Sequence, residues 1–175
     1  MKGIWEDGII EEVSINTKKD EHLLVPQANN MNRIYSIFLG LENGLTKEEV
    51  GKLYQIKDRQ GDYYLNSLVF IGLANKVKKI FFLSEEGYML YNLGSKERKE
   101  LFIKKLLSIP IISIAYDLYV NSSNNIEKNI IDILSNIISI RYNIENLTTA
   151  RRRASTIFSW VKWIILQDIE SVDKY

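Results

Sequence analysis

The chain has 175 residues, a length that suits one domain or two small ones. Its 46% hydrophobic and 26% charged residues exclude a fibrous or wholly disordered protein. With no cysteine and one histidine, it offers no disulfide, no thiol nucleophile and no Cys/His zinc site. The longest apolar runs fall short of the roughly 18 residues that cross a bilayer, and acidic residues follow Met1 where a signal peptide would be apolar. We therefore expect a cytoplasmic protein with no membrane partner.

The net charge of +1 conceals an uneven distribution along the chain. Residues 1–30 contain three lysines and six acidic residues, whereas residues 46–80 contain seven basic and four acidic residues. Residues 147–167 contain three consecutive arginines and one lysine but no acidic residue. The two basic regions are therefore the candidates for contact with a polyanion.

The first 30 residues are predicted to be an extended segment with two short strands, at residues 8–14 and 22–26. A helix is expected from Asn32, with an apolar i, i+3, i+4, i+7 pattern, and it stops at residues 43–44. Thr46 and Glu49 have the spacing of a capping box, which predicts a short second helix that ends near Gln55.

A third helix is expected to begin with Asp58 or Asp62 as its cap and to end at residues 72–73. Its buried stripe is predicted at Leu65, Leu68 and Val69, and its opposite face consists of Tyr63, Asn66, Ser67 and Phe70. Two strands, at residues 74–77 and 80–83, enclose a lysine turn, and Ser84 begins another helix. This order of elements is typical of a winged helix-turn-helix.

The second half is predicted to be helical throughout. Ser95 caps a helix over residues 96–108, and Pro110 begins the next helix, which ends near Val120. A hinge at residues 121–125 precedes a helix over residues 126–138, and a last helix runs from Thr148 or Thr149 to Gln167.

The last helix is expected to bury one stripe centred on Val161. Its opposite face would then expose Arg152, Thr156, Ser159 and Trp163. Trp160 and Trp163 cannot both lie under that single stripe, so one of them is expected to pack against the other domain.

These elements predict a mainly α fold with small β-hairpins. We expect two winged helix-turn-helix-like halves, residues 31–94 and 95–175, after an extended N-terminal segment at residues 1–30.

The start of the third helix combines residue types that read base edges and hold phosphates in a recognition helix. They are Arg59, Gln60, Tyr63 and Asn66. Three lysines lie where the wing would meet backbone phosphates, namely Lys76, Lys78 and Lys79. The alternatives are a helix cap with solvated polar residues, and a solvated turn.

A second candidate DNA-binding group lies in the last helix, where cations in the first turn oppose the helix dipole and favour an external anion. Its members are Arg151, Arg152, Arg153, Thr156, Ser159 and Lys162. The alternative is that the arginines form ion pairs with Asp132 or Glu145.

No catalytic site is predicted. The letters of residues 97–99, Glu-Arg-Lys, match part of a metal-dependent nuclease motif, but they fall in a predicted helix rather than on a strand. His22 has no serine or acidic partner at a recognisable spacing, and there is no glycine-rich phosphate loop. We therefore expect no enzyme activity, metal or cofactor in this chain.

From about Trp5 to Gln167 the chain resembles the tandem winged-helix region of bacterial type II restriction endonucleases and related defence proteins. The resemblance rests on residues 24–26, 59–64, 72–73, 83–87, 149–156 and 160–164. It implies a DNA-specificity module whose nuclease domain lies elsewhere in the chain or on a partner.

The sequence thus favours sequence-specific binding of double-stranded DNA, as the target-recognition module or subunit of a type II restriction system. A transcription regulator is one alternative. The other is a protein-interaction adaptor of a defence complex, with Phe70 and Trp160 or Trp163 as contacts. The candidate partners are double-stranded DNA, a nuclease domain or subunit, and a second copy of the chain.

Overall fold

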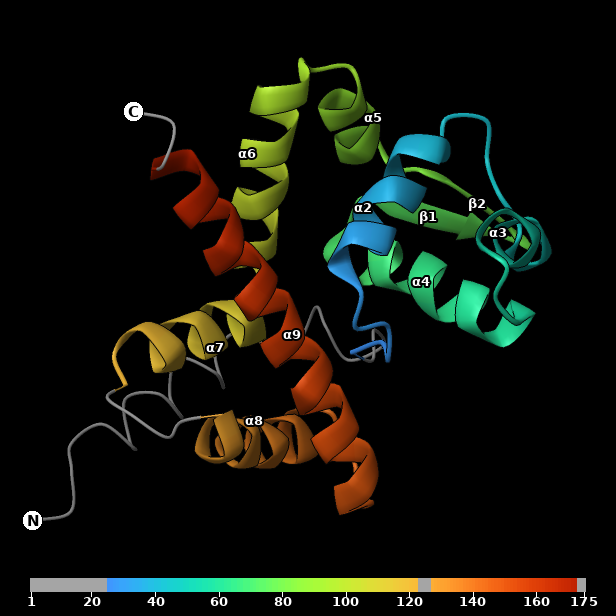
Figure 1. Ribbon diagram of the computed structural model, residues 1–175. Coiled ribbons are helices and arrows are strands. Elements are labelled where there is room, and N and C mark those ends of the chain that lie inside the picture. Colours follow the sequence, from blue (N-terminus) through green and yellow to red (C-terminus); the bar gives the residue numbers. More distant parts are fainter. Residues whose placement is uncertain (1–24, 123–126, 173–175) are drawn as a thin grey trace, which may run out of the picture.

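The computed structural model describes residues 25–122 and 127–172, and the predicted mainly helical fold is confirmed there (Figure 1). These residues form eight helices and one antiparallel two-stranded hairpin, rather than several hairpins. The strand predicted at residues 8–14 lies outside the described residues, as do residues 22–24. Val25 and Pro26 are described and do not belong to a strand.

The first two helices begin with caps that their sequences encode. α2 (Met31–Gly40) follows Asn30, whose side chain accepts a hydrogen bond from the Arg33 N–H. α3 (Lys47–Tyr54) has the predicted capping box, because Thr46 accepts from the Glu49 N–H and the Glu49 carboxylate accepts from the Thr46 N–H. These bonds satisfy N–H groups that the helix itself cannot pair.

α4 (Asp58–Ile71) begins differently from the prediction. Lys57 is its N-cap residue, so neither Asp58 nor Asp62 is the cap. The Gln60 side chain instead accepts a hydrogen bond of 3.3 Å from the Lys57 N–H. Ser67, predicted on the open face, is fully buried and donates its hydroxyl to the Tyr63 carbonyl, because the buried arc of α4 is wider than one stripe.

The hairpin has the predicted bounds, β1 (Ala74–Val77) and β2 (Ile80–Leu83). Val77 pairs with Ile80 across a two-residue turn. Leu45, between α2 and α3, pairs with Phe81 through two backbone hydrogen bonds of 2.9 Å. The hairpin is thereby joined to the segment that precedes α3.

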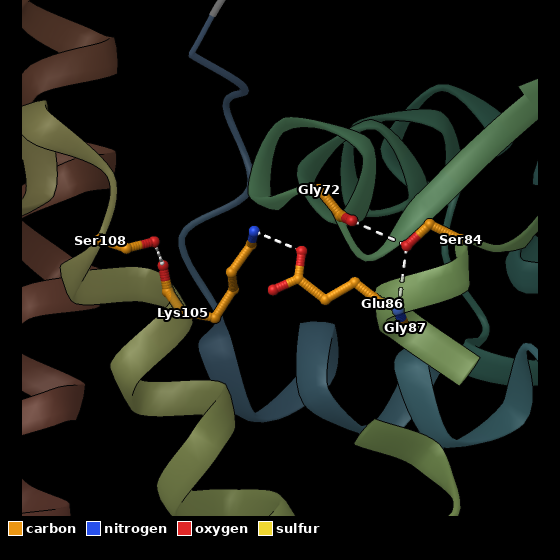
Figure 2. A network of polar contacts seen from close by, with 6 residues as sticks. All are labelled: Gly72, Ser84, Glu86, Gly87, Lys105 and Ser108. Carbon is orange, nitrogen blue, oxygen red and sulfur yellow. Dashed lines mark hydrogen bonds and ion pairs between the residues drawn. The ribbon is translucent and has the colours of Figure 1, made fainter. Parts of the chain in front are cut away.

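α5 (Glu85–Tyr91) begins at its predicted cap, Ser84. Figure 2 shows the Ser84 hydroxyl donating to the Gly72 carbonyl at 2.7 Å and accepting from the Gly87 N–H. A Cβ on Gly87 would lie 2.1 Å from the Leu73 carbonyl oxygen, so only glycine allows this close approach. The end of α4 and the start of α5 are held together in this way.

The remaining helices are α6 (Ser95–Leu107), α7 (Pro110–Val120), α8 (Glu127–Arg141) and α9 (Leu147–Val172). Gly94 caps α6, so the helix starts one residue before the prediction, and Ser95 is its first residue rather than its cap. Asn146 accepts a hydrogen bond from the Thr149 N–H, so α9 begins before Thr148. α8 and α9 also continue beyond their predicted ends.

α9 is the helix around which the two halves pack. It contacts α7 and α8 along one side and α2 on another (Figure 1). Trp160 packs 6.1 Å from the Phe70 ring of α4, and its indole N–H donates to the Ala28 carbonyl. The Trp163 N–H donates to the Asn32 side chain in α2.

The prediction that Trp163 lies on the open face of α9 is therefore wrong, whereas packing against the first half, expected for one tryptophan, is found for both. Trp160 is 0% and Trp163 is 7% exposed. The single-stripe prediction failed because α9 is covered on more than one side, so both tryptophans contact the first half of the chain.

Candidate nucleic-acid interface

Four lysines surround one hollow of about 150 Å³ at the hairpin. Lys76, Lys78 and Lys79 come from the hairpin, and Lys47 is the first residue of α3. Glu48, Asp62 and Phe81 complete its lining. The start of α4, the hairpin turn and α3 lie at the same end of the molecule, at the right of Figure 1. We call Lys47, Lys76, Lys78, Lys79 and Arg59 together the hairpin–α4 surface.

Lys47 belongs to this surface because α3 and α4 approach closely at Gly61. A Cβ on Gly61 would lie 2.6 Å from the Lys47 carbonyl oxygen. Lys47 lies in the basic region at residues 46–80, but no sequence pattern predicts it as a site residue. The glycine inside the Arg59–Tyr63 segment was the available signal, since an interior helical glycine often marks close backbone approach.

The three hairpin lysines differ in how far their charge is already compensated. Lys76 lies 3.6 Å from the Asp62 carboxylate and 4.8 Å from the centre of the Phe81 ring. Lys78 and Lys79 are exposed and form no ion pair within the part of the chain that the structure describes. These two charges are therefore free to meet an external anion.

Lys78 also has an unusual backbone conformation. Its φ is +56°, in the left-handed region that favours glycine, asparagine and aspartate. For another L residue this conformation costs about 1–2 kcal/mol. Lys78 therefore makes the folded state less stable than a glycine would, but it places a cation at the tip of the hairpin.

Arg59 and Gln60, in the first turn of α4, are both exposed but differ in how their side chains are engaged. Arg59 Nε donates to the Tyr63 hydroxyl at 2.7 Å, and the guanidinium carbon lies 5.6 Å from the Tyr63 ring centre. The Gln60 side-chain oxygen is already occupied by the Lys57 N–H. The helix-cap alternative thus applies to Gln60.

The two other predicted residues of α4 are less accessible. Tyr63 and Asn66 are half-buried, and the Asn66 amide donates to the Asp62 carbonyl at 2.8 Å. Farther along the helix, Phe70 packs against Trp160 of α9. The second half of the chain therefore covers the later turns of α4 and leaves its first turn open.

The three consecutive arginines have three different environments. Arg151 forms an ion pair with Asp132, one of the two acids named as its alternative partners. Arg153 is half-buried and donates to the Val25 carbonyl, and burial lowers the pKa of its guanidinium below the ordinary value. Arg152 is exposed, as predicted, and has no ion pair with any residue in 25–122 or 127–172.

The other predicted members of this group are largely engaged inside the protein. Thr156 is 4% exposed and donates to the Arg152 carbonyl, so its predicted exposure is wrong. The Ser159 hydroxyl donates to the Asn29 and Thr156 carbonyls. Lys162 is exposed, but its amine lies 3.4 Å from the Glu127 carboxylate. Arg152 is thus the cation of this group that remains open.

The residues that match part of the nuclease motif, 97–99, lie in a helix in the structure. Glu97 is exposed in the first turn of α6, the helical setting that the sequence predicted. The described ranges contain no group of three His, Asp or Glu side chains placed to bind a metal ion. His22 lies outside those ranges.

None of the described helices is both long enough and apolar enough to cross a membrane. Comparison with curated proteins and with solved structures gives no match. A family model described as "Domain of unknown function (DUF7226)" matches residues 33–168, more than half of the chain and parts of both halves. The chain therefore belongs to the DUF7226 family.

Proposed function

We propose that this protein binds double-stranded DNA through the hairpin–α4 surface. The observation that carries the proposal is the convergence of four lysines on one hollow beside α4. Phosphate oxygens are the natural partners of such cations, and contacts of this kind fix the position of a protein on a duplex. Arg59 lies one turn before Asp62, a residue that lines this hollow, and is exposed in the same first part of α4.

The order of the elements in residues 31–94 supports the same proposal. α2, the Leu45 bridge, α3, α4 and the hairpin follow one another as in a winged helix-turn-helix. In that architecture the second helix of the helix-turn-helix enters the major groove, and here that helix would be α4. The hairpin would then act as the wing that lies along the phosphates.

The second half, residues 95–172, would be a winged-helix-like unit without a wing, since the structure describes helices alone there. In this proposal it contributes Arg152 as an additional phosphate contact. Arg151 and Arg153 support the fold instead, through Asp132 and Val25.

The biological role that we propose is target recognition in a type II restriction system in the cytoplasm. It rests on the resemblance of residues 59–64 and 149–156 to restriction specificity regions. The chain would bind DNA without cutting it, and a nuclease domain or subunit would cleave.

Protein docking is a second candidate function, but the aromatic residues that the sequence suggested as contacts are not available for it. Phe70, Trp160 and Trp163 pack within the protein. The structure instead exposes apolar side chains along α8 and at the start of α9. Ile133 is 44%, Ile140 83% and Leu147 67% exposed.

The salt dependence of DNA binding tests the proposed function. We expect the log of the affinity for a labelled random duplex to fall linearly with the log of the KCl concentration, as measured by fluorescence anisotropy. Each phosphate contact contributes about 0.9 to this slope. Lys79→Ala should therefore reduce the slope by about one unit.

Lys78→Gly sharpens the test, because it removes a charge and relieves the left-handed backbone strain. We expect weaker DNA binding together with an unchanged or higher melting temperature, which excludes misfolding as the cause. Lys128→Ala, at an exposed position on α8, is the matched control and should leave the slope unchanged. If the duplex does not bind, and the chain instead binds a protein partner with an affinity that does not change with salt, the docking function is favoured.

A further inference from the structure

The Arg59 side chain is held in place by its own helix. Tyr63 is one turn later in α4, and its hydroxyl accepts the hydrogen bond from Arg59 Nε while its ring lies beside the guanidinium. The terminal Nη groups of Arg59 form no hydrogen bond or ion pair with any residue that the structure describes. The Arg59 side chain is therefore held in one orientation, and its two Nη groups are free to donate to a pair of acceptors that lie in one plane.

Guanine presents such a pair of acceptors in the major groove, namely N7 and O6 on one edge. Arginine bonds to both at once, and this bidentate pair discriminates strongly against other bases. Because Nε is already bound to Tyr63, the two Nη groups are the donors left for the base. Immobilisation before binding also lowers the entropy cost of the contact.

The neighbouring amides of α4 are poorly placed to add a bidentate contact to adenine. That contact needs both the oxygen and the nitrogen of one amide. The Gln60 oxygen caps the helix, and the Asn66 nitrogen donates to the Asp62 carbonyl. A contact to adenine would have to share one of these engaged atoms, whereas the two Nη groups of Arg59 form no hydrogen bond with any described residue.

We propose that Arg59, positioned by Tyr63, reads the guanine of a G·C pair in the major groove of the bound DNA. This inference rests on the proposed function, since it needs α4 to lie in the groove. It names a base that the protein recognises and gives Tyr63 the part of a positioning residue. Gln60, also predicted as a reader, caps the start of the helix through its side-chain oxygen.

The test starts with selection of duplexes from a random pool by the full chain. We expect the selected sites to share one G·C pair whose guanine can be replaced by 7-deazaguanine, which lacks the N7 acceptor. This replacement should weaken binding of the wild-type protein about tenfold, the effect of losing roughly half of a bidentate contact. In Arg59→Ala the same replacement should cause no further loss.

Two more variants separate recognition from general DNA binding. Tyr63→Phe keeps the ring but removes the hydroxyl, so the penalty for 7-deazaguanine should shrink while the salt slope stays constant. Lys79→Ala should weaken binding to every duplex and keep the full penalty. Circular dichroism melting checks that each variant is folded.

The outcomes distinguish this inference from the proposed function. If the protein binds duplexes with the expected salt slope but no selected guanine depends on Arg59, the guanine assignment is wrong and DNA binding stands. If Tyr63→Phe retains the full penalty, the positioning role of Tyr63 is wrong. Absence of salt-dependent binding would overturn both proposals.

Discussion

Arg151, Arg152 and Arg153 show why a run of charges has to be assessed residue by residue. All three follow one another in the first turns of α9, yet one forms an ion pair, one is open and one binds a backbone carbonyl. The sequence predicted the outward direction of Arg152 from helix geometry. It could not predict that Val25, 128 residues away, would occupy Arg153.

The adjacent pair Arg152 and Arg153 provides a matched prediction. Arg152→Ala should change the free energy of unfolding by less than about 0.5 kcal/mol and reduce the salt slope of DNA binding by about one unit. Arg153→Ala should lower the free energy of unfolding by about 1–3 kcal/mol, because the buried Val25 carbonyl loses a charged donor. Urea denaturation and binding titrations measure the two effects. The opposite pattern would show that the roles of the two arginines are exchanged.

At the scale of elements, local signals predicted α3 and the hairpin well. The Thr46 and Glu49 side chains encode the start of α3, and the turn at residues 78–79 separates two short strands. These features depend on residues close together in the sequence, and the structure confirms their positions. The start of α4 was missed because Gln60 acts from inside the helix, a less common cap than an aspartate.

The buried residues of α9 could not all be predicted from local sequence signals. Its periodicity predicts one buried stripe, with Thr156 and Trp163 on the open face. Both are buried because α2 and the segment before it cover a second side of the helix. Hydrophobic periodicity indicates that a helix has a buried face, but the number of elements that pack on it depends on tertiary structure.

The contact between Leu73, just after α4, and Gly87 of α5 leads to a prediction at this scale. Gly87→Ala should lower the free energy of unfolding by about 1–3 kcal/mol, since the added methyl would meet the Leu73 carbonyl and force the backbones apart. Gly40→Ala is the control, because a Cβ on this exposed residue at the end of α2 would meet only the Leu45 side chain, at 4.0 Å. It should not lower the free energy of unfolding. Equal effects in thermal melts would contradict this account of the contact.

At the scale of the whole molecule, the two halves are joined by several kinds of contact. The Trp160 ring packs against Phe70 in a tilted arrangement, and Lys105 of α6 forms an ion pair with Glu86 of α5 (Figure 2). Trp160 and the start of α9 lie against the segment before α2. These contacts position α9 against α4 and leave the hairpin and the first turn of α4 accessible.

This arrangement also defines which face a DNA duplex can approach. The later turns of α4 are covered by the second half, so the duplex would meet the first turn and the hairpin turn. The sequence identified both segments, with Lys47 as the exception. It could not show that Tyr63 and Asn66 would be half-buried, since their cover comes from tertiary contacts.

The location of DNA on the protein tests the central claim most directly. At 20.4 kDa the chain is suited to amide NMR, and a random 16-base-pair duplex can be titrated into the full-length protein. We predict that the largest amide shifts fall at residues 47–48, 57–63 and 76–80, and that raising the KCl concentration reverses them. Shifts confined to residues 133–147 of α8 and the start of α9, or no shifts at any residue, would contradict the account.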